Sequence, residues 1–101
     1  MARYVEIKKI QETPSEYYYS VVSPDYNQVP VFYIGINPKE KKVGFYKDSI
    51  DGSPECEIFV ENYESDELPA WIPGFLLYAT IKKVRQVIAE NQFGDYISFQ
   101  S

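Results

Sequence analysis

Histidine is absent from this 101-residue chain, and cysteine occurs once, as Cys56. Without histidine there is no Ser-His-Asp or Cys-His catalytic pair and no usual general base near neutral pH. One cysteine without histidine also disfavours a transition-metal site. A lone cysteine forms no intrachain disulfide, which is typical of a reducing compartment. We therefore expect a cytoplasmic protein that is not an enzyme and binds no metal or other cofactor.

Long apolar runs and glycine-rich loops are missing as well. The five glycines are scattered and form neither a G-x-G-x-x-G fingerprint nor a phosphate-binding P-loop. The apolar stretch at residues 71–79 is interrupted by Pro73 and Gly74 and is far shorter than the ~20 residues of a membrane span. The first residues contain no apolar segment typical of a secretory signal. We expect no membrane association.

The charge is acidic and unevenly distributed. Fifteen acids and ten bases give a net charge of −5 and a pI near 4.6. Nucleic-acid binding is therefore not expected, because affinity for the phosphate backbone depends on Lys and Arg. Residues 48–67 contain acids and no base, which is typical of a solvated surface that promotes solubility. The acidic patch predicted from this segment consists of Glu57, Glu61, Glu64, Asp66 and Glu67.

Aromatic residues are abundant: the chain has ten Tyr, six Phe and one Trp. Most of them lie in short segments whose apolar residues alternate with polar ones, a pattern typical of strands. Proline, glycine, asparagine and aspartate separate these segments and indicate turns. Asn37 and Pro38 form such a turn and predict a hairpin around it. Strands are expected at residues 3–10, 16–23, 31–36, 42–47 and 55–61, with a loop at residues 23–28.

The C-terminal part has a different, helical periodicity. From Pro73 or Gly74 onward, apolar residues recur at spacings of +4, +3 and +4 and form one stripe, which Asn91 or Gly94 ends. Residues 95–100 are a candidate short last strand. The stripe consists of Leu77, Ile81, Val84 and Ile88. We therefore predict a single α+β domain over residues 1–101, an antiparallel meander of about five strands with one C-terminal amphipathic helix packed on one face.

One helix can cover only one face of such a sheet, yet aromatic residues occupy both. The expected core places one strand face against the helical stripe, and the rings on the opposite face are then left uncovered. Depending on the register of the second strand, that face receives Tyr17 and Tyr19, or instead Tyr18. The expected strand core is Val5, Ile7, Phe32, Ile34, Ile36, Val43, Phe45, Cys56, Ile58 and Val60. The candidate interaction residues are Tyr17, Tyr19, Tyr33, Tyr46 and Phe59, with Trp71 as either a plug over the core or an exposed anchor.

Three functions fit these features, beside the plain alternative of an ordinary solvated sheet. The first is a non-catalytic interaction or assembly module that binds a protein partner or a second copy through the Tyr-rich face. The second is an acidic stoichiometric inhibitor of the immunity-protein type, whose carboxylates would occupy the phosphate-binding site of a basic toxin or nuclease. The third is a small-ligand binder, such as an aromatic platform for sugars. Cys56 is expected to be an inert, buried thiol.

Overall fold

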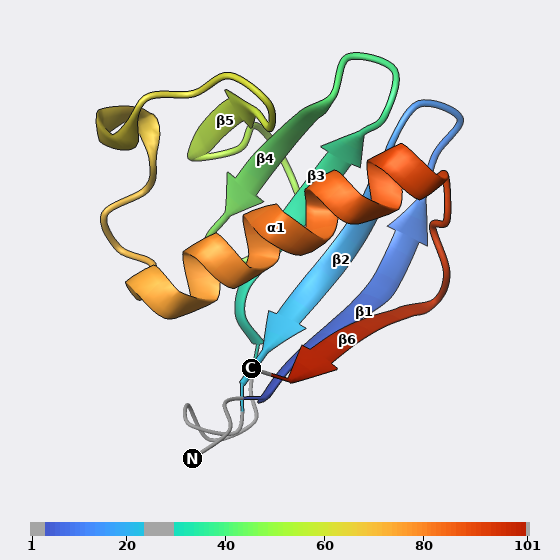
Figure 1. Cartoon of the computed structure of the whole chain (residues 1–101), viewed down its shortest axis with the longest axis horizontal. Helices are drawn as coiled ribbons and strands as arrows, with labels where there is room; N and C mark the ends of the chain where they lie inside the picture. Colours follow the sequence, from blue (N-terminus) through green and yellow to red (C-terminus); the bar gives the residue numbers. More distant parts are fainter. Residues whose placement is uncertain (1–3, 24–29, 101) are drawn as a thin grey trace.

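A six-stranded antiparallel sheet with one helix packed against it forms the structure (Figure 1). The computed structural model describes residues 4–23 and 30–100, so most of the loop expected at residues 23–28 lies outside the described residues. The elements are β1 (Tyr4–Glu12), β2 (Tyr17–Val22), β3 (Pro30–Asn37), β4 (Lys42–Tyr46), β5 (Cys56–Phe59), the 3-10 helix η2 (Ser65–Glu67), α1 (Gly74–Glu90) and β6 (Tyr96–Gln100). The predicted α+β class, the helix and the short last strand are confirmed.

The strand order is β5-β4-β3-β2-β1-β6. Strands β1 to β5 form a meander because short connections place consecutive strands side by side. At the predicted turn between β3 and β4, Asn37 Oδ1 accepts a hydrogen bond from the Glu40 amide at 3.1 Å, and Lys41 has a left-handed φ of 56°. After α1 the chain returns to pair β6 antiparallel with β1, on the side away from β2. The first strand thus lies inside the sheet.

Helix α1 has the ends that its sequence predicts. It begins at Gly74, and the Pro73 carbonyl accepts the first helical hydrogen bond from the Leu77 amide at 3.0 Å. It ends before Asn91, whose left-handed φ of 53° is tolerated because asparagine adopts this conformation more readily than most residues. The Gln92 amide then bonds back to the Val87 carbonyl at 3.1 Å and completes a C-terminal cap. None of the helices in the described residues has the length and apolar character needed to cross a membrane.

The core lies between α1 and one face of the sheet. Nearly all of the predicted core residues are buried, while Cys56 and Ile88 are only partly buried. Helix α1 also contacts the segment that follows β5, where Arg85 Nε donates a hydrogen bond to the Val60 carbonyl at 2.9 Å. The core also includes Tyr19, Val21, Ile72, Leu76, Val87 and Ile97. Within residues 4–23 and 30–100, no helix covers the opposite face of the sheet (Figure 1).

Candidate functional site

The register of β2 decides which tyrosines lie on the helix-free face. In the β2–β3 pairing, Tyr19 lies opposite Ile34 and Tyr17 opposite Ile36. Opposed residues of antiparallel strands project to the same side of the sheet, and both isoleucines are buried beneath α1. Tyr17 and Tyr19 therefore lie on the helix-covered face, and their placement on the helix-free face was wrong. Tyr18 takes that position instead.

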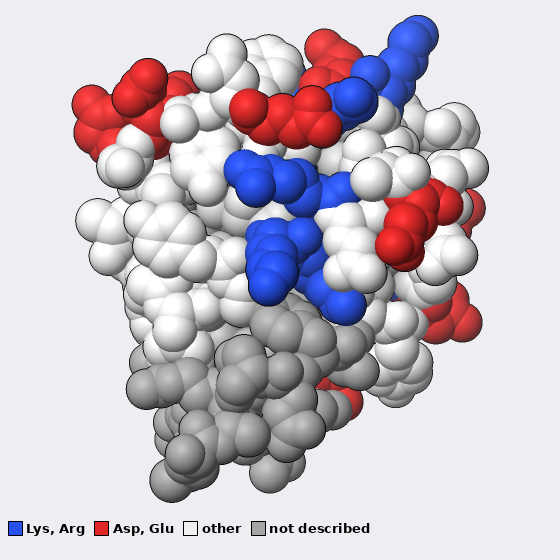
Figure 2. Space-filling model, in the orientation of Figure 1, with Lys and Arg blue, Asp and Glu red and all other residues white. Residues whose placement is uncertain are grey.

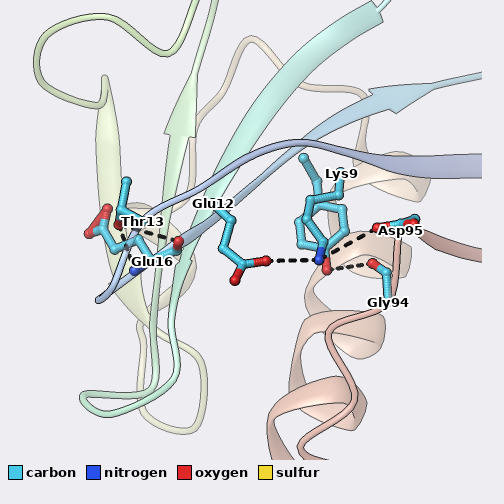
Figure 3. Close-up of polar contacts among 7 residues, drawn as sticks. Lys9, Glu12, Thr13, Glu16, Gly94 and Asp95 are labelled. Carbon is cyan, nitrogen blue, oxygen red and sulfur yellow. Dashed lines mark hydrogen bonds and ion pairs between the residues drawn. The ribbon is translucent and has the colours of Figure 1, made fainter.

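Tyr17 and Tyr19 both contact residues in the connection between α1 and β6. Tyr19 is 0% exposed, and its hydroxyl donates a hydrogen bond to the Gly94 carbonyl at 2.9 Å, so no polar atom of its side chain is left unsatisfied. The Tyr17 ring stacks on Phe93, with a centroid distance of 4.3 Å and an interplanar angle of 3°. Lys9 contacts the same connection through an ion pair from Nζ to Asp95 at 3.6 Å, and it also pairs with Glu12 of its own strand at 3.0 Å (Figure 3).

On the helix-free face, tyrosine rings lie over two glycines. Gly35 pairs with Tyr18 on one side and with Gly44 on the other, and Tyr33 pairs with Tyr46. A Cβ atom at Gly35 would lie 2.9 Å from Tyr18 Cε1 and 3.3 Å from Tyr46 Cε1. The two rings therefore rest on the bare glycine backbone, as aromatic residues do beside glycines in sheets. We call Tyr18, Tyr33, Tyr46 and Phe59 the tyrosine face.

Contacts within the chain hold these rings in place. Tyr18 and Tyr46 meet edge to face, with centroids 6.1 Å apart and planes at 68°. The Tyr18 hydroxyl donates a hydrogen bond to Glu16 Oε2 at 2.5 Å. Pro54, from the β4–β5 connection, packs over Gly44, with its Cβ 3.1 Å from where a glycine Cβ would be. As a result Tyr46 is only 7% exposed, although no helix covers it.

The remaining candidates differ in exposure. Tyr18 and Tyr33 are half-buried, and Phe59 is 52% exposed beside Lys42, whose Nζ lies 4.9 Å from the ring centroid. Tyr33, Tyr46 and Phe59 thus share the helix-free face, as predicted. Trp71 does not belong to it, because its ring packs against the core, edge to face with Phe32 at 6.3 Å. Of the two alternatives for Trp71, the core plug is the one found.

The predicted acidic patch is exposed but not uniform. Glu57 lies 3.7 Å from Lys42 Nζ, and Glu61 lies 3.7 Å from Lys41 Nζ. Glu67 accepts a hydrogen bond from the Glu64 amide at 2.7 Å at the start of η2. Acidic side chains gather over this corner of the molecule, at the upper left of Figure 2. Partial neutralisation of Glu57 and Glu61 leaves the strongest negative charge around η2, with Glu64, Asp66 and Glu67.

Cys56 contacts the same corner and has the properties of a structural thiol. It is half-buried, and its Sγ lies 2.8 Å from the Glu67 carbonyl as a hydrogen-bond donor. Burial, with the nearby Glu67 and Glu57 charges, raises the pKa of this thiol, so the reactive thiolate is disfavoured. In the described ranges, no group of three or more Cys, Asp or Glu side chains is arranged to hold a metal ion.

Comparison with known proteins gives no guide to the function. No family model matches the chain, and neither a curated protein nor a solved structure matches it significantly. Function is therefore inferred from the surface itself. The tyrosine face is the most distinctive part of that surface, because aromatic side chains from β2 to β5 converge on a side of the sheet that no helix covers.

Stability is expected to decrease at alkaline pH because the fold keeps several tyrosines protonated. Burial, with weaker effects from Tyr17, Asp95 and Glu12, raises the pKa of Tyr19 to about 12. The hydrogen bond to Glu16, followed by burial, raises the pKa of Tyr18, and burial and the Glu16 charge raise that of Tyr46. Since the unfolded chain loses these protons near pH ~10, the stabilisation is complete below that pH and decreases as pH rises toward ~12.

Urea unfolding between pH 8 and 11.5 measures this effect. The unfolding free energy should be constant up to about pH 10 and then decrease. Tyr18→Phe should make the decrease shallower, since one of the protonated groups is then gone. An unfolding free energy that is unchanged from pH 8 to 11.5 would contradict the prediction.

Proposed function

We propose that this protein is a non-catalytic binding module that takes a protein partner on its tyrosine face. The observation that supports this most is the one-sided fold: α1 covers one face of the sheet, and on the other Tyr18, Tyr33 and Phe59 surround the nearly buried Tyr46. Tyrosine combines an apolar ring with a polar tip and is enriched in protein interfaces.

The rings are already ordered before a partner binds. Tyr18 is fixed by Glu16 and by Tyr46, and both rings rest on the glycine backbone. Binding therefore requires little further loss of side-chain freedom, a loss of ~0.5–1.5 kcal/mol for each flexible side chain that an interface immobilises. The same rigidity favours recognition of one defined surface over loose hydrophobic association.

The surroundings of the tyrosine face favour a protein as the partner. Charges of both signs border it: Lys42 and Glu57 on the β4–β5 side, and Lys8 on β1. A mixed polar rim around an aromatic centre is the usual anatomy of a protein interface. A nucleic-acid partner would require a rim of positive charge. The Tyr18 and Tyr46 rings themselves occupy the space above Gly35, which makes a small sugar ligand the weaker alternative.

The hypothesis of an acidic stoichiometric inhibitor stays a prediction, and the structure favours it less than the binding module. Its surface would depend on Glu57, Glu61, Glu64, Asp66 and Glu67 acting together. Two of these carboxylates are paired with lysines of β4 and the preceding turn, and Trp71 is packed on the core rather than exposed beside them. The negative charge is therefore smaller and less concentrated than the sequence indicates.

Site-specific photo-crosslinking tests the proposed function. A photoreactive phenylalanine analogue in place of Tyr33, in the cells that produce the protein, should give a discrete protein adduct. The same analogue at Tyr78 is the matched control, because that ring is 55% exposed on α1, on the other side of the sheet. The Tyr33 adduct should disappear when Tyr18→Arg places a charge in the centre of the tyrosine face. Adducts that are absent, equal at both positions, or insensitive to Tyr18→Arg would refute the proposal.

A further inference from the structure

The two edges of the sheet are protected to different degrees. After β5 the chain turns back on itself, so Asn62 bridges Phe59 and its amide donates to the Phe59 carbonyl at 3.2 Å. The contact of Cys56 with the Glu67 carbonyl holds the following segment at the same edge. In contrast, β6 is the last strand in the order at the other edge, and among the described residues no strand pairs with its outer side.

The residues of β6 lack the usual safeguards of an open edge. Natural edge strands avoid pairing with other chains through charges, prolines or bulges. The sequence Tyr-Ile-Ser-Phe-Gln of β6 contains neither a charge nor a proline, and its pairing with β1 is regular from end to end. Tyrosine, isoleucine and phenylalanine are all favoured in strands. This edge is therefore suited to accept another strand.

One hydrogen bond shows which backbone groups of β6 point outward. The Lys9 amide donates to the Asp95 carbonyl at 2.8 Å, and these residues continue the register of the β1–β6 pairing. In an antiparallel ladder, directly bonded pairs alternate with pairs that are not bonded to each other. Ile97 and Phe99 consequently bond to β1. The amides and carbonyls of Tyr96, Ser98 and Gln100 then face the open edge.

A polar groove of about 270 Å³ runs beside this edge, between β6 and one flank of α1. Lys83, Gln86 and Glu90 line it from the helix. Lys83 and Glu90 lie about two turns apart, so the groove has a basic end and an acidic end. Helix α1 and β6 run in opposite directions along the two sides of the groove (Figure 1). Lys82, Lys83 and Arg85 are the cations of α1, and Figure 2 shows basic side chains gathered over the middle of this side of the molecule.

We propose that β6 pairs antiparallel with the β6 of a second copy of this chain, about a two-fold axis through Ser98. Ser98 would bond to Ser98 of the second copy, and Tyr96 to Gln100, which gives about six backbone hydrogen bonds and one continuous sheet. The axis is perpendicular to the sheet, so both α1 helices lie on the same side. Each groove borders Tyr96 and Ile97, on the N-terminal side of Ser98, so the two-fold leaves the two grooves on opposite sides of the axis and the contact between the copies is the pairing of the two β6 strands.

Oligomeric state and amide exchange test this dimer directly. Light scattering coupled to size exclusion should give twice the chain mass at micromolar to millimolar concentration. The Ser98 amide should become more protected from hydrogen exchange as concentration rises. Ser98→Pro should weaken dimerisation by roughly tenfold or more, since the symmetric change removes two hydrogen bonds between the copies. The monomer should keep its circular dichroism spectrum, because proline is tolerated where an edge amide faces outward.

Charge reversal tests the orientation of the two copies. Tyr96→Glu with Gln100→Glu should weaken the dimer several-fold at low salt, because Tyr96 of one copy lies opposite Gln100 of the other, and Tyr96→Glu with Gln100→Lys should restore it. Lys82→Glu is the matched control, because it lowers the net charge by the same two units but is not among the residues of α1 beside β6. Tyr33→Ser should leave the dimer intact, since the tyrosine face is a separate surface. A wild-type monomer at millimolar concentration, a Ser98→Pro dimer of unchanged affinity, or a double variant that is not restored would each overturn the proposal.

Discussion

Replacing Tyr19 with alanine is expected to lower the unfolding free energy by about 3–5 kcal/mol, the usual cost of truncating a buried aromatic ring. Tyr19 is fully buried under the end of α1. The truncation leaves a cavity in the core and also removes the hydrogen bond to the Gly94 carbonyl. The loss is a large part of the total stability of a domain of this size. Urea unfolding followed by circular dichroism measures it.

Two variants separate the contributions of the Tyr19 ring and its hydroxyl. Tyr19→Phe keeps the ring and should cost about 1 kcal/mol, because only the hydrogen bond is lost. Tyr78→Ala is the control for the removal of an exposed ring and should change stability by less than ~0.5 kcal/mol, apart from a small gain in helix propensity. If Tyr19→Ala proved as mild as Tyr78→Ala, the register of β2 described here would be wrong.

Gly35→Val is expected to destabilise the fold by about 1–3 kcal/mol, although valine is a better strand former than glycine. The reason lies on the helix-free face, where the added side chain would enter the space of the Tyr18 and Tyr46 rings. Both rings would have to leave the glycine backbone. The near-ultraviolet circular dichroism of the tyrosines should weaken together with the stability.

A double variant shows whether ring displacement is the cause. With Tyr18→Ala already present, Gly35→Val should cost clearly less than in the wild type, since the closest obstruction is gone. Gly74→Ala is the control for glycine substitution, because open space surrounds its Cβ position at the start of α1. That change should be neutral or stabilise by up to ~1 kcal/mol. Equal costs of Gly35→Val with and without Tyr18 would show that the rings do not occupy the glycine backbone.

The elements could be predicted from sequence because each has a clear period. Alternating residues mark β3 and β4, and the Leu77–Ile81–Val84 spacing marks α1. The side of β2 could not be predicted in the same way. Tyr17, Tyr18 and Tyr19 follow one another directly, so the same residue type lies on both faces of the strand. The alternation therefore does not predict which face of β2 packs against α1. Only the pairing with Ile34 and Ile36 decides, and this is a long-range contact.

The candidate site was predictable to a similar degree. The hairpin around Asn37 places Gly35 opposite Gly44, a pairing that sequence could have revealed as a gap for rings. The cover that Pro54 provides was not predictable, because it depends on the path of an irregular loop. Likewise the buried state of Tyr19 depends on the Gly94 carbonyl, 75 residues away in sequence. The burial of a tyrosine is difficult to predict from sequence, because it depends on a hydrogen-bond acceptor for the hydroxyl.

The strand order has a consequence for synthesis in the cell. Strand β1 is the first to leave the ribosome, but its second neighbour, β6, is made only after α1. Until then the nascent sheet exposes the unpaired backbone of β1 along its whole length. Such transient edges are where newly made chains aggregate or recruit chaperones. The outer side of β1 is therefore covered only after α1 and β6 have been made and β6 has paired with it.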